Sequence, residues 1–134
     1  MKRFLLGLVL FLSLAMPFQG GVYKMRFMEK LDLDLWYSGY NESLFNNQLP
    51  RDTRVVWSDV DQTCGETFPR SDGGFLITIS PSCNVTRAEA LLTLIHEMVH
   101  IHQWYTNKAF GAHGPMFEKE MIRIADSGAL EGLW

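Results

Sequence analysis

The sequence predicts a small α+β domain: a lead-in helix, a short antiparallel hairpin or small sheet, and two further helices. Three observations support this. Apolar residues recur at helical spacing near both ends of the chain, the middle is rich in β-branched residues, and a helix-start motif separates the middle from the second helical part. With 134 residues, 47% hydrophobic and 20% charged, the chain has the length and composition of one packed domain.

The first helix is expected within residues 27–45, where Leu31, Leu35 and Leu44 supply apolar faces. Ser38-Gly39 is expected to break this helix into two pieces, because glycine disfavours a helix interior. The alternation of Leu and Asp in residues 31–35 also fits a strand, so that alternative stays open. Residues 46–50, Asn-Asn-Gln-Leu-Pro, are typical of a turn.

The middle of the chain contains two segments with strand composition, residues 54–60 and 74–80. Between them, residues 71–74 read Ser-Asp-Gly-Gly, which is strong turn chemistry, so the two segments are expected to form an antiparallel hairpin. Residues 63–68 are expected to extend the first strand, with Gly65 marking a bulge.

Two helices are predicted after the strands. Thr86-Arg-Ala-Glu89 is a capping box ahead of an apolar run, so a helix is expected from there to about Thr106. Residues 107–112 are expected to form a loop. Pro115 occupies the first-turn position that proline prefers, and the closing helix that it starts is expected to end at Gly128.

Residues 1–24 resemble a signal-peptide leader and residues 25–134 form the predicted domain. Lys2 and Arg3 precede a 13-residue apolar run, too short to span a bilayer comfortably but typical of the hydrophobic part of a signal peptide. Met25 is an equally reasonable start for a chain without a leader. The protein is therefore expected to be exported or membrane-associated if Met1 is the start, and cytoplasmic if translation begins at Met25.

Charge and cysteine content restrict the partners. The net charge is −3 and no basic cluster is visible, so the sequence gives no support for nucleic-acid binding. Cys64 and Cys83 are the only cysteines; they would form one bridge in an exported protein, or remain as two buried thiols. Neither lies in a CxxC pair, so a cysteine zinc site is not indicated.

The second predicted helix carries the motif His96-Glu-Met-Val-His100. A spacing of four residues brings both imidazoles to one helix face, where they can bind one zinc ion. Glu97 projects beside that face and can act as general base on a zinc-bound water. The alternative, a surface helix with two incidental histidines, fits poorly because the motif lies among apolar residues.

A zinc site of this kind needs a third protein ligand. His113 lies 13 residues past His100, just before Gly114, whose missing side chain is expected to let the chain turn tightly toward the metal. Glu120 lies 20 residues past His100 on the closing helix, and the spacing alone leaves both open. From its neighbours, Glu120 is expected to face solvent, and His102 is expected to point away from the site.

The motif at 96–100, followed by Ala-His-Gly-Pro-Met-Phe at 112–117, resembles the SprT-like (Spartan-type) metallopeptidase domain. The similarity covers roughly residues 31–134, and further matching segments occur in the same order upstream: 41–45, 49–50, 56–58 and 64–65. The resemblance implies a zincin-like fold, one Zn²⁺ per chain, His113 as the third ligand and Glu97 as the catalytic residue. It also implies a protein or peptide substrate and possible DNA association, which the charge does not support; a monomer is expected.

The sequence therefore predicts a zinc-dependent endopeptidase. The first alternative is a non-catalytic zinc module that binds a partner; the intact Glu97 speaks against it, since a purely structural site has no use for that carboxylate. The second is a metal hydrolase that acts on a non-peptide amide, such as cell-wall material if the protein is exported.

Overall fold

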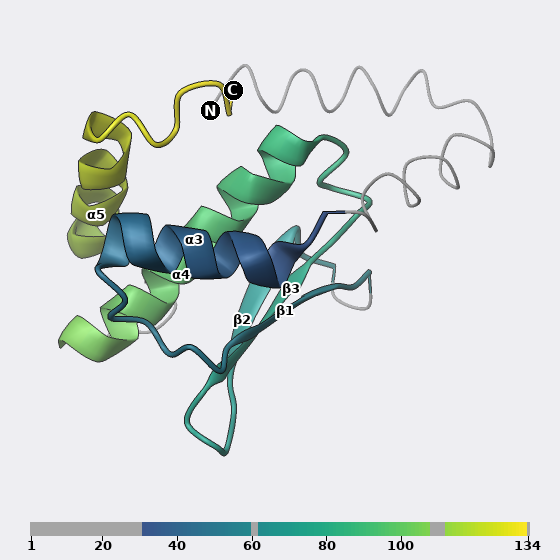
Figure 1. The fold of residues 1–134 in the computed structure, drawn as a ribbon, viewed down its shortest axis with the longest axis horizontal. Coiled ribbons are helices and arrows are strands. Elements are labelled where there is room, and N and C mark those ends of the chain that lie inside the picture. Colours follow the sequence, from purple (N-terminus) through teal and green to yellow (C-terminus); the bar gives the residue numbers. More distant parts are fainter. Residues whose placement is uncertain (1–30, 60–61, 108–111, 134) are drawn as a thin grey trace.

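The computed structural model describes residues 31–59, 62–107 and 112–133, which fold into one helix, a three-stranded sheet and two further helices (Figure 1). The elements in chain order are α3 (Leu33–Phe45), β1 (Arg54–Trp57), β2 (Gly65–Pro69), β3 (Phe75–Ile79), α4 (Arg87–Asn107) and α5 (Pro115–Asp126). This is the α+β class that the sequence predicts. The leader at 1–24, Val60 and most of the loop at 107–112 lie outside the described residues. None of the described helices is long and apolar enough to cross a membrane.

The sheet has the order β1-β3-β2, and its pairing corrects one prediction. Strands β2 and β3 are antiparallel and form the hairpin, with Gly73 at a φ of 97° in the predicted turn. Strand β1 instead pairs in parallel with the other side of β3, with Trp57 opposite Ile79. Residues 65–69 are thus a separate strand and not an extension of the first one.

The physical reason is that turn chemistry acts locally. The turn at 71–74 pairs β3 with the segment immediately before it, which leaves only the far side of β3 for β1. The end of β1 is then anchored beside the end of β3, because the Asp59 carboxylate accepts hydrogen bonds from the hydroxyls of Ser80 (2.7 Å) and Ser82 (2.6 Å). Gly65 also pairs regularly with Ile79, so the predicted bulge is absent from β2.

Helix α3 is continuous, so the predicted break at Ser38-Gly39 is wrong. Gly39 is exposed, and a Cβ there would meet nothing within 4 Å. The glycine therefore destabilises the helix only through its weak helix propensity. Packing overrides that cost, because the buried face of α3 continues on both sides of the glycine. The helix ends at Asn46, whose φ of 52° confirms the predicted turn. At the other end of α3, Asp34 accepts a hydrogen bond from the Val55 backbone N–H of β1 at 2.9 Å.

The core lies between the sheet and helices α3 and α4. Figure 1 shows α3 crossing α4, with the sheet on one side of them and α5 on the other. Strand β3 is central in the sheet, and the buried apolar side of α4 joins its residues in one cluster; the members with no exposed surface include Ile77, Ile79, Leu94, Ile95, Met98 and Ile101. Each such side chain contributes about 1.5–3 kcal/mol by leaving water. Helix α4 is thereby held firmly, and its other face is free to carry polar residues.

The two cysteines form a disulfide, which decides between the two alternatives left by the sequence. Cys64 and Cys83 have Cα atoms 5.2 Å apart and a sequence separation of 19. The bridge joins the residue just before β2 to the segment that leads into α4. It therefore ties the edge strand of the sheet to the start of the central helix.

Reduction of this disulfide is expected to lower the free energy of unfolding by about 3 kcal/mol, because the bridge restricts a loop of this length in the unfolded chain. Urea unfolding of the oxidised protein, the protein in dithiothreitol and the Cys64→Ser/Cys83→Ser variant measures the difference. The last two should agree with each other. Unfolding curves that coincide for all three would contradict the expectation.

Candidate metal centre

Helix α4 starts at the predicted capping box. The Glu89 backbone N–H donates to the Thr86 hydroxyl at 3.1 Å, and the Thr86 backbone N–H donates to the Glu89 carboxylate at 3.0 Å. These two bonds satisfy backbone donors that the first helical turn leaves without partners. Ten residues into the helix, His96 and His100 lie on the same side, with their ring centroids 5.0 Å apart.

His113 completes a group of three histidines. Its Nε2 lies 3.1 Å from Nε2 of His96 and 3.0 Å from Nε2 of His100. Nitrogen ligands about 2.0–2.1 Å from a tetrahedral ion lie roughly 3.3 Å from one another, so these atoms are already close to the spacing that a shared ion requires. Among the described residues, this is the group of His, Cys, Asp and Glu side chains placed to hold a metal ion.

The protonation states of the buried histidines suit metal binding. Burial, together with the neighbouring His100 and His113, lowers the pKa of His96 to about 4. Burial also lowers the pKa of His100, although the contact with Gln103 acts in the opposite direction. Both imidazoles are therefore neutral near pH 7 and carry the lone pair that a metal ion needs.

Gln103 orients His100, a role that the sequence did not reveal. Its Oε1 lies 3.0 Å from Nδ1 of His100, so the Nδ1–H donates to the amide and Nε2 is left to face the other histidines. The amide nitrogen of Gln103 donates to the Ala112 carbonyl at 3.0 Å. One buried side chain thus links the helix to the segment that carries His113. Its position on the His96 face of the helix, seven residues after His96, was the available signal, but that position also fits a residue that lines a substrate groove.

Phe117 supports all three rings from α5. Its ring centroid lies 4.7 Å from that of His96 and 4.8 Å from those of His100 and His113. Pro115 stands at the start of α5, as predicted, and Phe117 follows two residues later, in the first turn, with 7% of its surface exposed. The phenyl ring gives the imidazoles an apolar backing that restricts their orientation.

The tight turn expected at Gly114 is absent, although His113 lies beside the other two histidines as predicted. Gly114 has a φ of −79°, which any residue can adopt, and a Cβ there would meet nothing within 4 Å. The glycine is therefore not what turns the chain. The bond from Gln103 to the Ala112 carbonyl and the packing of Phe117 account better for the position of His113.

Glu97 lies beside the histidines, only 6% exposed. Its pKa is raised to about 7, because burial, helped by the nearby Glu66 carboxylate, outweighs the hydrogen bond from Thr67, which lowers the pKa. The Thr67 hydroxyl donates to Oε2 of Glu97 at 2.6 Å. Nothing in the sequence around Thr67 indicated this contact, which joins β2 to α4 across 30 residues.

Gly65 lets β2 approach α4 closely, which explains a glycine in a regular strand. A Cβ at this position would lie 2.5 Å from Cγ2 of Thr93 and 3.2 Å from Oε1 of Glu97. The first distance is well inside van der Waals contact, and Thr93 is β-branched and stiff.

Gly65→Ala is therefore expected to destabilise the protein by about 1–3 kcal/mol, the usual cost of overpacking. Gly39→Ala is the matched control, because that glycine is exposed in a helix; there the change should stabilise by about 0.5–1 kcal/mol. Chemical denaturation of the two variants beside the wild type measures both effects. Equal shifts in the same direction would contradict the close approach of β2 to α4.

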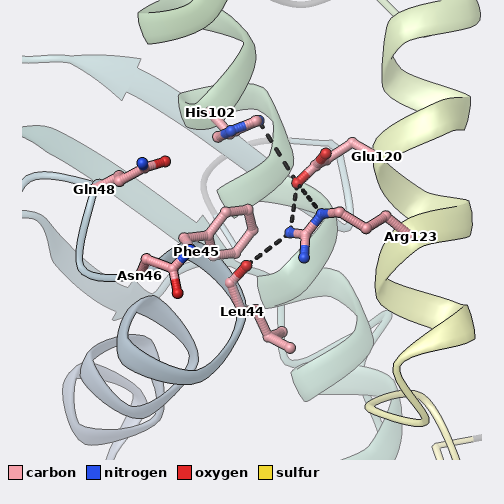
Figure 2. Close-up of a pocket in the computed structure, with 7 residues that line it drawn as sticks. All are labelled: Leu44, Phe45, Asn46, Gln48, His102, Glu120 and Arg123. Atoms are coloured by element: carbon pink, nitrogen blue, oxygen red, sulfur yellow. Dashed lines mark hydrogen bonds and ion pairs between the residues drawn. The ribbon is translucent and has the colours of Figure 1, made fainter.

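Glu120, the alternative third ligand, belongs to a different cluster (Figure 2). Its Oε1 accepts bonds from Nε (2.9 Å) and Nη2 (2.6 Å) of Arg123, and Nη2 also donates to the Leu44 carbonyl at 2.7 Å. The side chain is only 14% exposed, so the expectation that it faces solvent is wrong. Its carboxylate instead helps to fasten α5 to the end of α3.

His102 also faces this second cluster, as expected for a residue that points away from the three histidines. Its Nδ1 lies 3.7 Å from Oε1 of Glu120, and its ring packs against Phe45. Together with their neighbours these residues line a pocket of about 270 Å³, which Figure 2 shows at the junction of the three helices.

The fold and the three converging histidines define a small zincin-like α+β domain with a candidate metal site. The model of the SprT-like family matches residues 33–131, which is more than half of the chain. The chain therefore belongs to the SprT-like family, as the sequence resemblance predicts. The matched span begins with α3 and includes all elements of the described fold, so the histidines, Glu97 and the strands beside them all lie within it.

Proposed function

We propose that the protein is a zinc-dependent endopeptidase in which His96, His100 and His113 bind the metal and Glu97 is the general base. The observation that supports this most directly is the convergence of three Nε2 atoms at ligand spacing beside a buried carboxylate on the same helix. Membership in the SprT-like family supports the same reading.

The donor set favours zinc. Neutral imidazole nitrogen is a preferred zinc ligand, and three protein ligands leave one position open, which is typical of catalytic and not of structural zinc sites. The group contains no thiolate and no carboxylate among its three members. Calcium and magnesium prefer oxygen ligands, so they fit this set poorly.

A bound zinc ion would polarise the scissile carbonyl and lower the pKa of a coordinated water to about 7. Glu97 accepts a proton from the attacking water, whose oxygen bonds to the carbonyl carbon. Glu97 then delivers that proton to the departing amine as the C–N bond breaks. A group whose pKa lies near the working pH can accept and release a proton with similar ease, and burial raises the pKa of Glu97 toward that range in the metal-free site.

Strand β2 offers a place for the substrate backbone. It pairs with β3 on one side, and no other described strand pairs with its outer edge. An extended peptide can add to such an edge through main-chain hydrogen bonds. Because Thr67 of β2 contacts Glu97, a peptide on that edge would pass beside the catalytic carboxylate.

The test is hydrolysis of an unfolded protein, such as casein, and of peptidoglycan by the zinc-loaded domain, with the products identified by mass spectrometry. We expect about one zinc per chain, internal cleavage of the protein substrate, loss of cleavage with a chelator and recovery on adding zinc. Cleavage of peptidoglycan alone would favour the amide-hydrolase alternative. Tight zinc binding without hydrolysis of either would favour a non-catalytic module.

A further inference from the structure

Strand β2 runs beside the Glu97 carboxylate and contacts one of its oxygens. Thr67 donates its hydroxyl proton to Oε2 at 2.6 Å, and the backbone of Gly65 lies so near Oε1 that a Cβ would approach it to 3.2 Å. Both residues are held in regular register with β3, Thr67 opposite Ile77 and Gly65 opposite Ile79. The orientation of the carboxylate is thus tied to the position of the strand.

The hydrogen bond from Thr67 restricts rotation of the Glu97 carboxylate about its terminal torsion. The terminal torsion of Glu is broad, so an unrestrained carboxylate rotates over a wide range of orientations. A buried charge-assisted bond from a hydroxyl at 2.6 Å selects one orientation and occupies Oε2. Oε1 is then left to accept a proton from water.

A purely structural role explains the contact less well. Thr67 is buried, with 7% of its surface exposed, and valine has the same shape and an equally good strand propensity. The hydroxyl must find a partner at such a position, and here its partner is the one buried carboxylate on the histidine-bearing face of α4.

We infer that Thr67 is a positioning residue for hydrolysis, holding the Glu97 carboxylate in the one orientation that aims Oε1 at the attacking water. The inference rests on the proposed function, because it assigns a role to Thr67 only if Glu97 acts as the base. A misplaced catalytic group slows the chemical step without weakening substrate binding. Loss of the hydroxyl should therefore lower kcat and leave KM unchanged.

The test compares Thr67→Val, which removes the hydroxyl and keeps the shape, with Thr67→Ser, which keeps the hydroxyl. Thr78→Val is the matched control, because Thr78 is equally buried at 7% on the adjacent strand. With zinc-loaded protein, we expect kcat to fall about 10- to 100-fold in Thr67→Val, with KM and zinc content unchanged. Thr67→Ser and Thr78→Val should stay within about threefold of the wild type. If Thr67→Val does not fold, Thr67→Ala replaces it in the same comparison.

Three results would overturn the inference. Wild-type kcat in Thr67→Val would show that the hydroxyl does not position the base. An equal loss in Thr67→Ser or Thr78→Val would show that packing and not the hydroxyl matters. Both results leave the proposed function intact, because the wild type is active in each. An inactive wild type, or full activity in Glu97→Gln, would remove the proposed function itself and the role of Thr67 with it.

Discussion

Glu97→Gln is expected to keep the fold and the metal and to lose nearly all turnover. The amide is isosteric with the carboxylate, and its oxygen can still accept the bond from Thr67, so the contact between β2 and α4 survives. It cannot take a proton from water at neutral pH. General-base catalysis contributes about 10²- to 10⁴-fold, and kcat should fall by that factor. Zinc analysis, a thermal melt and steady-state kinetics of the purified variant measure all three properties.

Glu66→Gln is the control for this variant. Glu66 is also a carboxylate close enough to raise the pKa of Glu97, but it is not placed to serve as the base in the proposed scheme. Its loss should change kcat only modestly. Hydrolysis by Glu97→Gln at the wild-type rate would show that Glu97 is not the base and that the proposed steps are wrong.

The second large effect concerns the third ligand. His113→Ala should weaken zinc binding by more than about 100-fold, because even residues that only orient a ligand contribute 10- to 100-fold in affinity. Glu120→Ala should keep tight zinc binding. It removes one of the two hydrogen-bond partners of Arg123, so the bond from Arg123 to the Leu44 carbonyl between α5 and α3 is held less firmly, which should cost about 1 kcal/mol of stability. Zinc titration against a chromophoric chelator, with urea unfolding alongside, separates the two variants.

The opposite order of zinc affinities in these two variants would contradict the assignment of His113 as the third ligand. Tight zinc in His113→Ala together with weak zinc in Glu120→Ala would make Glu120 the third ligand. The 3.0 and 3.1 Å distances between His113 and the other imidazoles would then describe a contact between rings and not a metal site.

Local signals predicted the helices well. The capping box at Thr86 and Glu89 forms as expected, and the helix that follows keeps His96 and His100 on one side because their spacing depends on helix geometry alone. Pro115 likewise marks the start of α5. Each of these predictions needs information from only a few neighbouring residues.

Contacts between distant segments were harder to predict. The turn at 71–74 indicates that β3 belongs to a hairpin, but it does not show which earlier segment is the other strand. The parallel pairing of β1 with β3 was therefore missed. Gly65 in a strand fits either a bulge or a close approach, and only the position of α4 shows that the second is right. The contact between Thr67 and Glu97 joins residues whose separation leaves no pattern in the sequence.

The hydrogen bond from the Val55 backbone to Asp34 has a consequence for self-association. A sheet with open edges invites strands from other copies, and proteins commonly block an edge with a charged side chain. On the outer side of β1, a carboxylate from α3 already occupies a backbone donor, and an incoming strand would have to displace it. No other described strand pairs with the outer side of β2. We therefore expect self-association through β1 to be disfavoured relative to the addition of an extended chain at the β2 edge.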